Sequence, residues 1–511
     1  MKKRALISVT DKTGVVEFAK KLNELGYEIV STGNTYKKLA ENGVIVLSIE
    51  QVTHFPEILD GRVKTLNPYV HGGILFKRHE KSHVETVQEH NIGPIDMVVV
   101  SLYDFEGAVR SGKSHDEIVE NIDIGGPSMI RSASKNYKDV TVVVDIADYK
   151  MVIEKLENGG LTVEDRRKLA YKAFSVTARY DTLISSYFAE VVGENYPDIL
   201  NLTFEKDTEL RYGENGHQRG FLYSQPNAKN PILNFKQLHG KELSFNNIND
   251  LYGCLEFMRE FKDSKEVCAV AIKHANACGV GLGKNSSEAF TKCFESDKVS
   301  IFGGIVGITS TVDKATAEML SKIFLEIVVA YDFDEDALEI LQSKKNLRIL
   351  KLAKIEESKQ KYDMKYLDGK LLVQDRDIIK DEKEEVVTKK TPTQEELDDM
   401  KFGMKIVKNL KSNAIAIVKD GQTLAMGCGQ TSRIWALSNA IENNKEEKDF
   451  KGAVLASDAF FPFDDCVRLA AQYGITAIVQ PGGSIRDEDS INACNELGIS
   501  MVFTGKRHFK H

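Results

Sequence analysis

The sequence predicts an α/β protein of several domains, in which strands alternate with helices. Three observations support this prediction. Short apolar runs alternate with amphipathic stretches near the N-terminus, a strand and helix pattern occurs twice in the C-terminal half, and the 511 residues exceed what one hydrophobic core usually serves. At roughly 150 residues per domain, the length predicts about three domains, with two as readily expected.

The N-terminal part of the chain shows a strand, a polar turn and a helix in repeated order. Residues 4–9 form a short apolar strand, and the turn Thr10–Gly14 opens a helix with apolar residues at helical spacing. A second strand at residues 27–30 leads into the turn Ser31–Thr35 and another helix. Further strands are expected at residues 44–49, 97–102 and 141–144. This alternation is typical of βαβ units in a parallel sheet.

The two polar turns are candidate phosphate sites. Backbone N–H groups at a helix N-terminus are unpaired, and the helix dipole is positive there. One such turn usually only caps its helix, but two of them with the basic segment Arg62–Thr65 favour a phosphorylated substrate. Asp123 and Lys135 add a carboxylate and a cation farther along the chain.

A domain boundary is expected after a long amphipathic stretch. Residues 163–192 have helical periodicity, and the segment Gly193–Pro197 that follows contains typical helix-ending residues. We therefore place the first domain at residues 1–198 and the second at residues 199–511.

The second domain contains an internal repeat of strand, G-x-G segment and strand. The first copy comprises residues 269–273, 281–283 and 302–306, and the second comprises residues 414–419, 427–429 and 452–456. We expect two similar α/β/α subdomains at roughly 199–372 and 400–511, although chance similarity between α/β units is an alternative. The charged, apolar-poor segment Asp375–Asp399 between them is interpreted as a solvated connector.

One apolar strand ends in a pair of titratable side chains. The run Cys268–Ile272 leads directly into Lys273 and His274, and glycines follow within a few residues. A buried strand that ends in this way delivers both side chains to a cleft, whereas the alternative is a solvated loop. Two further polar clusters, Arg211–Gln218 and Gly427–Arg433, favour one site built from distant loops.

Composition argues against several classes of protein. The chain has 68 basic and 76 acidic residues, a net charge of −8 and no long block of one sign, so nothing indicates binding to nucleic acid or to an anionic membrane. No stretch approaches the ~18 apolar residues of a membrane span, and the first apolar run is too short for a signal peptide. We expect a cytoplasmic protein. The seven cysteines never form C-x-x-C, which indicates neither a disulfide framework nor a zinc ribbon.

Motifs along the whole chain resemble one enzyme family. In order between residues 5 and 511 they are SVTDKTG, STGNT, GRVKTL, HGGIL, IDIGG, RYGENGHQ, IKHANACG, GQTSR, SDAFFPFDD, QPGGSIRDE and RHFKH. Together they resemble the bifunctional purine-biosynthesis enzymes that combine AICAR transformylase (phosphoribosylaminoimidazolecarboxamide formyltransferase) with IMP cyclohydrolase. The resemblance implies a methylglyoxal-synthase-like α/β domain followed by two cytidine-deaminase-like α/β/α subdomains. Deaminase zinc chemistry is not implied, because residues 199–511 contain neither H-x-E nor P-C-x-x-C.

The resemblance implies that the second domain transfers a formyl group from the cosubstrate 10-formyltetrahydrofolate to the amine of AICAR. His274 is then the candidate general base, Lys273 the cation that assists the leaving folate nitrogen, and Asn413 the donor to the oxyanion. Because strand neighbours point to opposite faces, we expect the pair to lie where the strand gives way to a loop at Ala275–Gly279. AICAR would contact Arg211, Tyr212, His217, Gly303, Glu326, Arg507 and Phe509. Folate would contact Ser432, Arg433, Phe460 and Asp465, with core packing as the alternative for Phe460.

The resemblance implies that the first domain closes the ring of the formylated product, FAICAR, to give IMP with loss of water. The acid, base and oxyanion set would be Lys64, Tyr103, Asp123 and Lys135. The phosphate would lie among Ser8, Thr10, Lys12, Thr32, Gly33, Asn34, Thr35, Arg62 and Thr65. The family further implies a homodimer with transformylase sites shared between subunits, no catalytic metal, and room for a structural monovalent cation.

Six positions depart from the family's motifs. They are Asn34, Asn67, Asp104, Gly216, Ala277 and Tyr331, and each of the last four replaces a loop proline of the family's motifs. Since a proline in a compatible loop contributes about 0.4 to 1 kcal/mol, we expect these loops to be less ordered. Asp104 adds a negative charge beside Tyr103, from which we expect a cyclohydrolase weaker than is usual for the family.

Two other functions stay open at this point. The first is a homologue that binds AICAR or folate but has one activity weakened or lost because of those loop changes. The cyclohydrolase is the activity more readily lost. A methylglyoxal-synthase-type lyase would follow from the first domain alone, but it leaves residues 199–511 unexplained.

Overall fold

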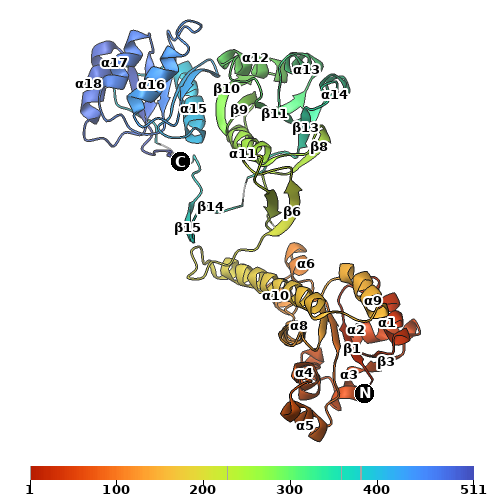
Figure 1. Cartoon of the computed structure of the whole chain (residues 1–511). Coiled ribbons are helices and arrows are strands. Elements are labelled where there is room, and N and C mark those ends of the chain that lie inside the picture. The colour runs from red at the N-terminus through yellow and green to blue at the C-terminus, as the bar shows by residue number, and fades with distance from the viewer. Residues whose placement is uncertain (1, 227, 229, 358, 380–382) are drawn as a thin grey trace. The chain divides into compact units, whose positions relative to one another are not determined.

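A computed structural model describes residues 2–226, 228, 230–357, 359–379 and 383–511. The chain forms two compact units (Figure 1), of which the first runs to Phe204 and takes in the short stretch that begins at Gln225. The second comprises the other residues from Glu205 onward. Residues 380–382 of the expected connector lie outside the described residues, and the predicted domain boundaries stay predictions.

A five-stranded parallel sheet forms the centre of the first unit. In spatial order its strands are β3 (Val46–Ser48), β2 (Glu28–Ser31), β1 (Arg4–Ser8), β4 (Met97–Val100) and β5 (Thr141–Val143). These strands lie at the predicted positions, and the predicted parallel α/β arrangement is confirmed. Central strand β1 has no solvent exposure at Ala5, Leu6 or Ile7, as expected for a parallel strand covered on both faces.

Helices connect the strands of the first unit. They are α1 (Val15–Glu24), α2 (Gly33–Glu41), α3 (Ile49–Thr53), α4 (Pro68–Leu75), α5 (Lys81–Glu89), α6 (Phe105–Arg110), α7 (His115–Val119), α8 (Gly125–Lys135), α9 (Tyr149–Glu157) and α10 (Val163–Val192), with short 3-10 turns η1 (Leu59–Gly61) and η2 (Ile146–Asp148). Helix α10 fills the predicted stretch because both ends carry clear signals. Thr162 and Asp165 form a capping box, and Gly193 ends the helix in the left-handed region at φ 73°.

The second unit is built on a mixed sheet of twelve strands. In spatial order they are β16 (Glu385–Val386), β21 (Ser500–Phe503), β20 (Ala477–Gln480), β19 (Val454–Ser457), β17 (Ile415–Lys419), β18 (Gln422–Gly427), β10 (Asn276–Gly283), β9 (Val267–Lys273), β11 (Ile305–Val312), β12 (Ile327–Phe333), β13 (Arg348–Leu352) and β8 (Phe235–His239). Two separate hairpins pair β6 (Glu205–Leu210) with β7 (Gly220–Ser224) and β14 (Tyr362–Leu367) with β15 (Lys370–Asp375).

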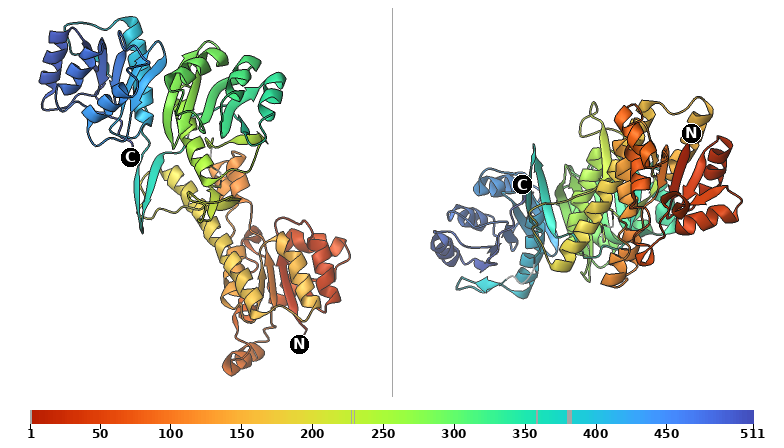
Figure 2. Two further views of the ribbon diagram at one scale, coloured as in Figure 1. Left: turned by 45° about the horizontal axis from the view of Figure 1, so that its top comes forward. Right: turned by 90° about the horizontal axis from the view of Figure 1, so that it is seen from below.

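The large sheet contains one strand pattern twice. In the first copy β9 pairs antiparallel with β10 and β11, and β11, β12 and β13 then run parallel. In the second copy β17 pairs antiparallel with β18 and β19, and β19, β20 and β21 then run parallel. The two copies lie side by side in Figure 2 as the green and blue parts of the ribbon. This topology agrees with the repeat that the sequence predicts.

Helices cover both faces of the sheet in each copy. They are α11 (Phe245–Glu260), α12 (Ser286–Ser296), α13 (Lys314–Ser321), α14 (Glu335–Gln342), α15 (Gln394–Asn409), α16 (Arg433–Glu442), α17 (Asp465–Gln472) and α18 (Asp487–Leu497). Helices α11 and α15 share one core with strands from both copies, whereas α12–α14 and α16–α18 pack in two separate cores. None of the described helices is long and apolar enough to cross a membrane.

Helix α15 begins inside the expected connector, so the last residues of that segment are not a solvated linker. Glu396 and Asp399 are buried. The Asp399 carboxylate accepts the backbone N–H groups of Asp420 and Gly421, both at 2.9 Å, which are the residues that join β17 to β18. The charge in this segment therefore serves partly to fix a turn.

The two copies are joined where β10 lies beside β18. Their strand register is a single pair, Gly281 with Gln422, so few backbone hydrogen bonds hold the junction. The buried hydroxyl of Thr423 accepts the N–H of Val280 at 2.9 Å and also lies 2.9 Å from Ser296 Oγ. The Thr423 hydroxyl accepts the hydrogen bond that a backbone carbonyl would accept in a regular strand ladder, and it thereby links the second copy to the first.

Replacing Thr423 by valine keeps the shape of the side chain but leaves the buried N–H of Val280 without its acceptor. We expect the free energy of unfolding to fall by about 1 to 3 kcal/mol, the cost of an unsatisfied buried donor. Denaturant unfolding of the full chain measures this change. Thr291→Val removes a hydroxyl that is exposed on α12 and is the matched control. Equal stability of the two variants would contradict the role given to Thr423.

Candidate active sites

Lys273 and His274 lie at a tight hairpin between β9 and β10. Lys273 ends β9, His274 and Ala275 form the turn, and Asn276 begins β10. Both turn residues have positive φ, 53° and 57°, which is the type I′ backbone that Asn-Gly usually forms. Each L-residue in that region costs about 1 to 2 kcal/mol. The expected loop at Ala275–Gly279 is therefore wrong in its length, because strand pairing resumes at Asn276.

The side chain of Lys273 is directed to the loop before β11. Its Nζ donates a hydrogen bond to the carbonyl oxygen of Phe302 at 2.9 Å, next to Gly303. Glu326 lies beside the same loop, because its backbone N–H donates to the carbonyl oxygen of Gly304 at 2.9 Å. The structure thus brings Lys273 together with Gly303 and Glu326, two of the residues expected to hold AICAR.

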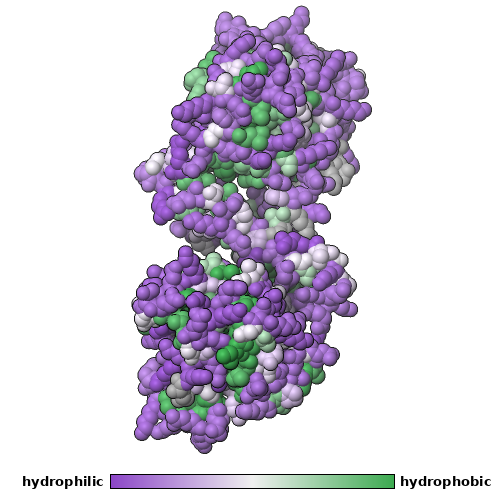
Figure 3. Space-filling model, turned by 90° about the vertical axis from the view of Figure 1, so that its right-hand side faces the viewer, coloured by the Kyte–Doolittle hydropathy of each residue, from purple (hydrophilic) through white to green (hydrophobic). Residues whose placement is uncertain are grey.

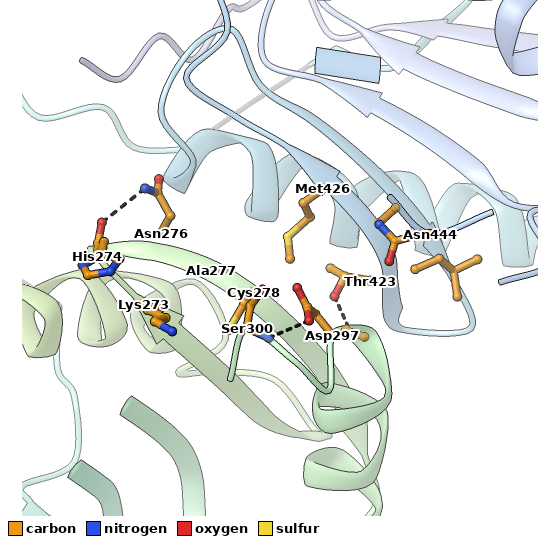
Figure 4. A pocket seen from close by; sticks show the side chains of 13 residues that line it. Lys273, His274, Asn276, Ala277, Cys278, Asp297, Ser300, Thr423, Met426 and Asn444 are labelled. Atoms are coloured by element: carbon orange, nitrogen blue, oxygen red, sulfur yellow. Dashed lines mark hydrogen bonds between the residues drawn. The ribbon is translucent and has the colours of Figure 1, made fainter. Parts of the chain in front are cut away.

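The hairpin borders a pocket of about 270 Å³ at the junction of the two sheet copies (Figure 4). The lining residues are Lys273, His274, Asn276, Ala277, Cys278, Ser296, Asp297, Ser300, Thr423, Leu424, Ala425, Met426 and Asn444. In Figure 4, His274 and Asn276 lie at one end of the pocket, and Asn444 lies at the other. The buried Oδ1 of Asn276 has no hydrogen-bond partner among the described residues, so it can accept from a ligand.

Sequence reasoning did not select most of these lining residues. The Asp297 carboxylate accepts the N–H groups of Val299 and Ser300 at 3.0 and 2.8 Å, and it shapes the wall opposite β18. Its chain position before a loop gives no chemical signal. Only the pairing of β10 with β18 places this residue at the pocket.

Arg433 holds the side chain of Asn413 in place. The buried Arg433 guanidinium forms an ion pair with Asp458, and its Nη2 donates to Asn413 Oδ1 at 2.7 Å. Asn413 Nδ2 donates to the carbonyl oxygen of Gln430 at 2.9 Å, which uses one of its two amide hydrogens. None of the described residues accepts the other hydrogen, so it can bind a ligand. Arg433 was expected to contact folate, but in this structure its charge is directed to Asp458 and Asn413.

Asp458 is a residue that sequence reasoning missed. It has no solvent exposure, and its carboxylate accepts from the Ser412 hydroxyl, from the N–H of Ala414 at 3.1 Å and from Arg433. Its carbonyl oxygen accepts the N–H of His508 at 2.8 Å. The motif SDAFFPFDD contains this aspartate directly after a strand, and that position was the available signal.

The C-terminal residues run beside Asn413. The N–H of Lys510 donates to Ser412 Oγ at 3.1 Å, and the N–H of Ser412 donates to the carbonyl oxygen of Lys510 at 2.9 Å. The guanidinium of Arg507 stacks 4.7 Å from the centre of the Phe509 ring. Two residues expected to hold AICAR are therefore carried on a segment that is hydrogen-bonded next to Asn413.

Other predicted ligand residues lie at ends of elements. The Arg211 guanidinium lies over the Tyr212 ring at 4.8 Å, and the carbonyl oxygen of Tyr212 accepts the N–H of Phe245 at the start of α11. His217 is exposed in the same loop. The predicted folate residues Ser432, Phe460 and Asp465 lie at the N-cap of α16, just after β19 and at the first residue of α17.

In the first unit, the predicted phosphate residues gather at the carboxyl ends of β1 and β2. Ser8 Oγ lies 2.8 Å from Thr32 Oγ1, and the N–H of Thr10 donates to Ser101 Oγ at 2.7 Å. Lys12 Nζ donates to the carbonyl oxygen of Thr10 at 3.2 Å. Gly33, Asn34 and Thr35 form the first turn of α2. The chain adds β2 and β3 on one side of β1 and then β4 and β5 on its other side. The carboxyl end of β1 is therefore the topological switch point, which is where open α/β sheets bind ligands.

Lys64, Tyr103 and Asp123 lie close to one another at this edge. Burial raises the pKa of the Asp123 carboxyl, against the opposing effects of the Gly126 and Tyr103 N–H groups and the Lys64 charge. The Gly126 N–H donates to Asp123 Oδ1 at 2.8 Å. Lys64 Nζ lies 3.9 Å from the point that a Cβ on Gly33 would occupy, so the lysine reaches the phosphate turn.

Two predicted residues of the first unit lie elsewhere or have other partners. Asp123 precedes α8, whereas Lys135 is its last residue, and a helix of 11 residues spans about 16 Å. The structure does not bring Lys135 to Asp123. Arg62 forms an ion pair with Glu120 instead of standing free for a phosphate. The Thr65 side chain packs against Gly125, the first residue of α8.

Several departures from the family's motifs have structural roles. Asn67 Oδ1 accepts the N–H of Tyr69 and caps α4, and Asp104 Oδ1 accepts the N–H of Gly107 at 2.8 Å and caps α6. Ala277 is buried in β10. A cap stabilises a helix by about 0.5 to 2 kcal/mol, so Asp104, which was expected to loosen its loop, instead anchors a helix, and Asn67 caps another. The weaker cyclohydrolase expected from Asp104 stays a prediction.

Comparisons with known proteins agree with this arrangement. The family described as AICARFT/IMPCHase bienzyme matches residues 133–443, and the MGS-like domain matches residues 14–128. The bifunctional purine biosynthesis protein PurH of Clostridioides difficile (strain 630) is 75% identical over 511 residues, which cover 100% of both chains. PurH of Thermoanaerobacter sp. (strain X514) is 54% identical over 515 residues, again with 100% of both chains covered.

A solved structure, the crystal structure of ForH, is 34% identical over 37% of this chain and 100% of its own, with a TM-score of 0.33. That score is too low to carry an argument about the fold. The family match covers more than half of this chain, and the identity to the relatives extends over its whole length. The chain therefore belongs to the AICARFT/IMPCHase bienzyme family.

Proposed function

We propose that this bifunctional purine-biosynthesis enzyme transfers a formyl group to AICAR at the Lys273–His274 hairpin and closes the ring of FAICAR at Lys64, Tyr103 and Asp123. The matched family and the full-length PurH relatives support both activities. The observation that carries the assignment of the transferase site is the hairpin turn, which holds a lysine and an imidazole at the rim of a polar pocket.

In formyl transfer, the 5-amino group of AICAR is the nucleophile. Its lone pair is conjugated with the ring, so the amine attacks the formyl carbon only if a base removes its proton as the new C–N bond forms. His274 is exposed at the turn and takes that proton. When the bond between the formyl carbon and N10 of the folate breaks, Lys273 gives a proton to the departing nitrogen.

The remaining groups stabilise charge and hold the substrates. Asn413 donates its free amide hydrogen to the oxyanion of the tetrahedral intermediate, and Arg433 fixes the amide in that orientation. Arg507 is the cation suited to the AICAR phosphate, because a guanidinium can bind it with two hydrogen bonds. 10-Formyltetrahydrofolate is the cosubstrate that supplies the formyl group.

In ring closure, the carboxamide nitrogen of FAICAR attacks the formyl carbon and water leaves. Asp123 takes the amide proton, for which its raised pKa makes it a stronger base than an ordinary carboxylate. Lys64 stabilises the oxyanion, which receives the proton from Asp123 and becomes a hydroxyl. Lys64 then protonates this hydroxyl, which leaves as water, and regains a proton from the formamide nitrogen as the ring double bond forms. Tyr103 positions the same oxygen. The phosphate is held at the N-terminus of α2, between the turns that contain Thr10 and Thr32.

A homodimer is part of the proposal. The pocket of about 270 Å³ is smaller than the ~300 to 1,000 Å³ typical of ligand pockets, so one chain alone offers too little space for a ribotide and a folate together. Large apolar side chains are exposed, among them Tyr171 at 76%, Val192 at 73% and Phe302 at 61%. Figure 3 shows hydrophobic patches on an otherwise largely hydrophilic surface, as expected where another subunit binds.

The proposal includes a cytoplasmic location, no nucleic-acid or membrane partner and no catalytic metal, with a structural monovalent cation left open. In the part of the chain that the structure describes, no group of three or more His, Cys, Asp or Glu side chains is placed to hold a metal ion. A homologue that binds the substrates with one activity lost is the competing function, and separate assays of the two reactions distinguish it.

Replacing His274 or Lys273 by alanine should reduce formyl transfer by about 10²- to 10⁴-fold, the usual contribution of a general acid or base. Ring closure by the same variants should stay unchanged, since its residues belong to the other unit. Tetrahydrofolate release from AICAR and 10-formyltetrahydrofolate, and IMP formation from FAICAR, are measured separately. His239→Ala, which removes an imidazole on edge strand β8, is the control. Full formyl transfer by His274→Ala would refute this site.

The geometry of the first unit predicts unequal effects for two lysines. Lys64→Ala should reduce IMP formation from FAICAR by about 10²-fold or more, because the charge next to Asp123 is lost. Lys135→Ala should reduce it by less than about tenfold, since one helix length separates this lysine from the carboxylate. Each variant is the control for the other. An equal or larger loss in Lys135→Ala would contradict the assignment of Lys64, and not Lys135, to the site around Asp123.

A further inference from the structure

The turn that carries His274 is held from one side by α11. The carboxylate Oδ1 of Asp250 accepts the backbone N–H of Ala275 at 2.8 Å. Gly253 lies one helical turn later on the same face, and a Cβ there would be 3.4 Å from the Cα of Ala275. Helix α11 therefore contacts the turn closely at Gly253 and hydrogen-bonds it at Asp250.

We propose that Asp250 is a positioning residue for formyl transfer, because its carboxylate holds the His274–Ala275 turn in the left-handed conformation that presents the imidazole to the pocket. This inference rests on the proposed function, in which His274 removes the proton of the amine. Asp250 lies outside the family's motifs, and its position inside a helix gives no sequence signal for a role in the site.

The need for such a contact follows from the residues in the turn. A two-residue turn with positive φ at both positions favours Asn-Gly, and neither His nor Ala adopts that region readily. The pairing of β9 with β10 closes the hairpin but does not satisfy the N–H of Ala275 at its tip. Asp250 supplies that acceptor, so the same hydrogen bond stabilises the turn and fixes the direction of His274.

The other contacts of the hairpin restrain different groups. Asn276 Nδ2 donates to the carbonyl oxygen of His274 at 3.2 Å, and Lys273 Nζ donates to Phe302. Burial raises the pKa of the Asp250 carboxyl, while the Ala275 N–H and the charge of His274 oppose the rise. The carboxylate is thus near the backbone N–H groups of both turn residues, of which that of Ala275 donates to it at 2.8 Å.

A double-mutant experiment on the full chain tests the inference. Asp250→Ala should lower kcat for formyl transfer by about 10- to 100-fold with a smaller change in KM for AICAR, because the base is misplaced and not the substrate. Ala275→Gly alone should stay near the parent rate, since glycine adopts positive φ without strain. The double variant should recover to within about threefold of Ala275→Gly, because a relaxed turn no longer needs its acceptor.

A conservative variant separates the acceptor from the charge. Asp250→Asn keeps an oxygen of similar position for the N–H of Ala275, and we expect it to keep kcat within about tenfold of the parent. A loss as large as that of Asp250→Ala would overturn the inference, because the charge and not the hydrogen bond would then matter. IMP formation from FAICAR and the melting temperature are measured for every variant as controls of folding.

Further outcomes separate this inference from the function on which it rests. His274→Ala is assayed in parallel, and if it keeps full formyl transfer, the proposed function itself fails. If His274→Ala is inactive while Asp250→Ala keeps its kcat, the inference alone is overturned. It is also overturned if Ala275→Gly does not restore the rate of Asp250→Ala. Should Asp250→Ala fail to fold, Asp250→Ser, which shortens the side chain, replaces it in the same comparison.

Discussion

The edge at which β10 meets β18 is the constraint on which the second unit depends. Each copy of the repeated strand pattern would end there in an unpaired strand, and an unpaired edge is a liability in a folded protein. The copies cover each other's edge, with the buried hydroxyl of Thr423 bridging a gap in the backbone ladder. The pocket lies at this junction and takes its lining from both copies, so the fold repeat creates a site that neither copy holds alone.

The two units place their chemistry in different ways. In the first unit, a parallel sheet brings the ends of β1, β2 and β4 to one edge, where helix N-termini favour a phosphate. In the second unit, the central side chains sit on a strained two-residue turn that strand pairing and α11 hold together. Strain of this kind persists only where the surroundings over-determine the conformation, and such places are commonly functional.

Much of the fold was predictable from the sequence because its signals are local. The parallel strands, the helix at residues 163–192 and the internal repeat follow from periodicity, caps and turn residues that lie within a few positions of one another. The loop at Ala275–Gly279 was wrong because His-Ala is not a hairpin sequence, and the short turn is stabilised by strand pairing and by packing against Gly253 and Asp250, which are distant in sequence. Similarly, the charged segment predicts solvated side chains at Glu396 and Asp399, whereas both are buried and accept hydrogen bonds from residues far along the chain, Thr476 for Glu396 and Asp420 and Gly421 for Asp399.

The candidate site shows the same division between local and distant information. Motifs transfer a role by position along the chain, and they cannot say that α8 separates Lys135 from Asp123 or that Arg433 faces Asp458. A buried guanidinium needs a carboxylate, because an unpaired charge inside a protein is several kcal/mol unfavourable, on the order of 3 to 5 when a partner is removed. Once that pair has formed, the direction of Asn413 is fixed before any substrate arrives. Orientation that folding has already supplied does not have to come from binding energy, which is why the proposed oxyanion donor Asn413 suits its role.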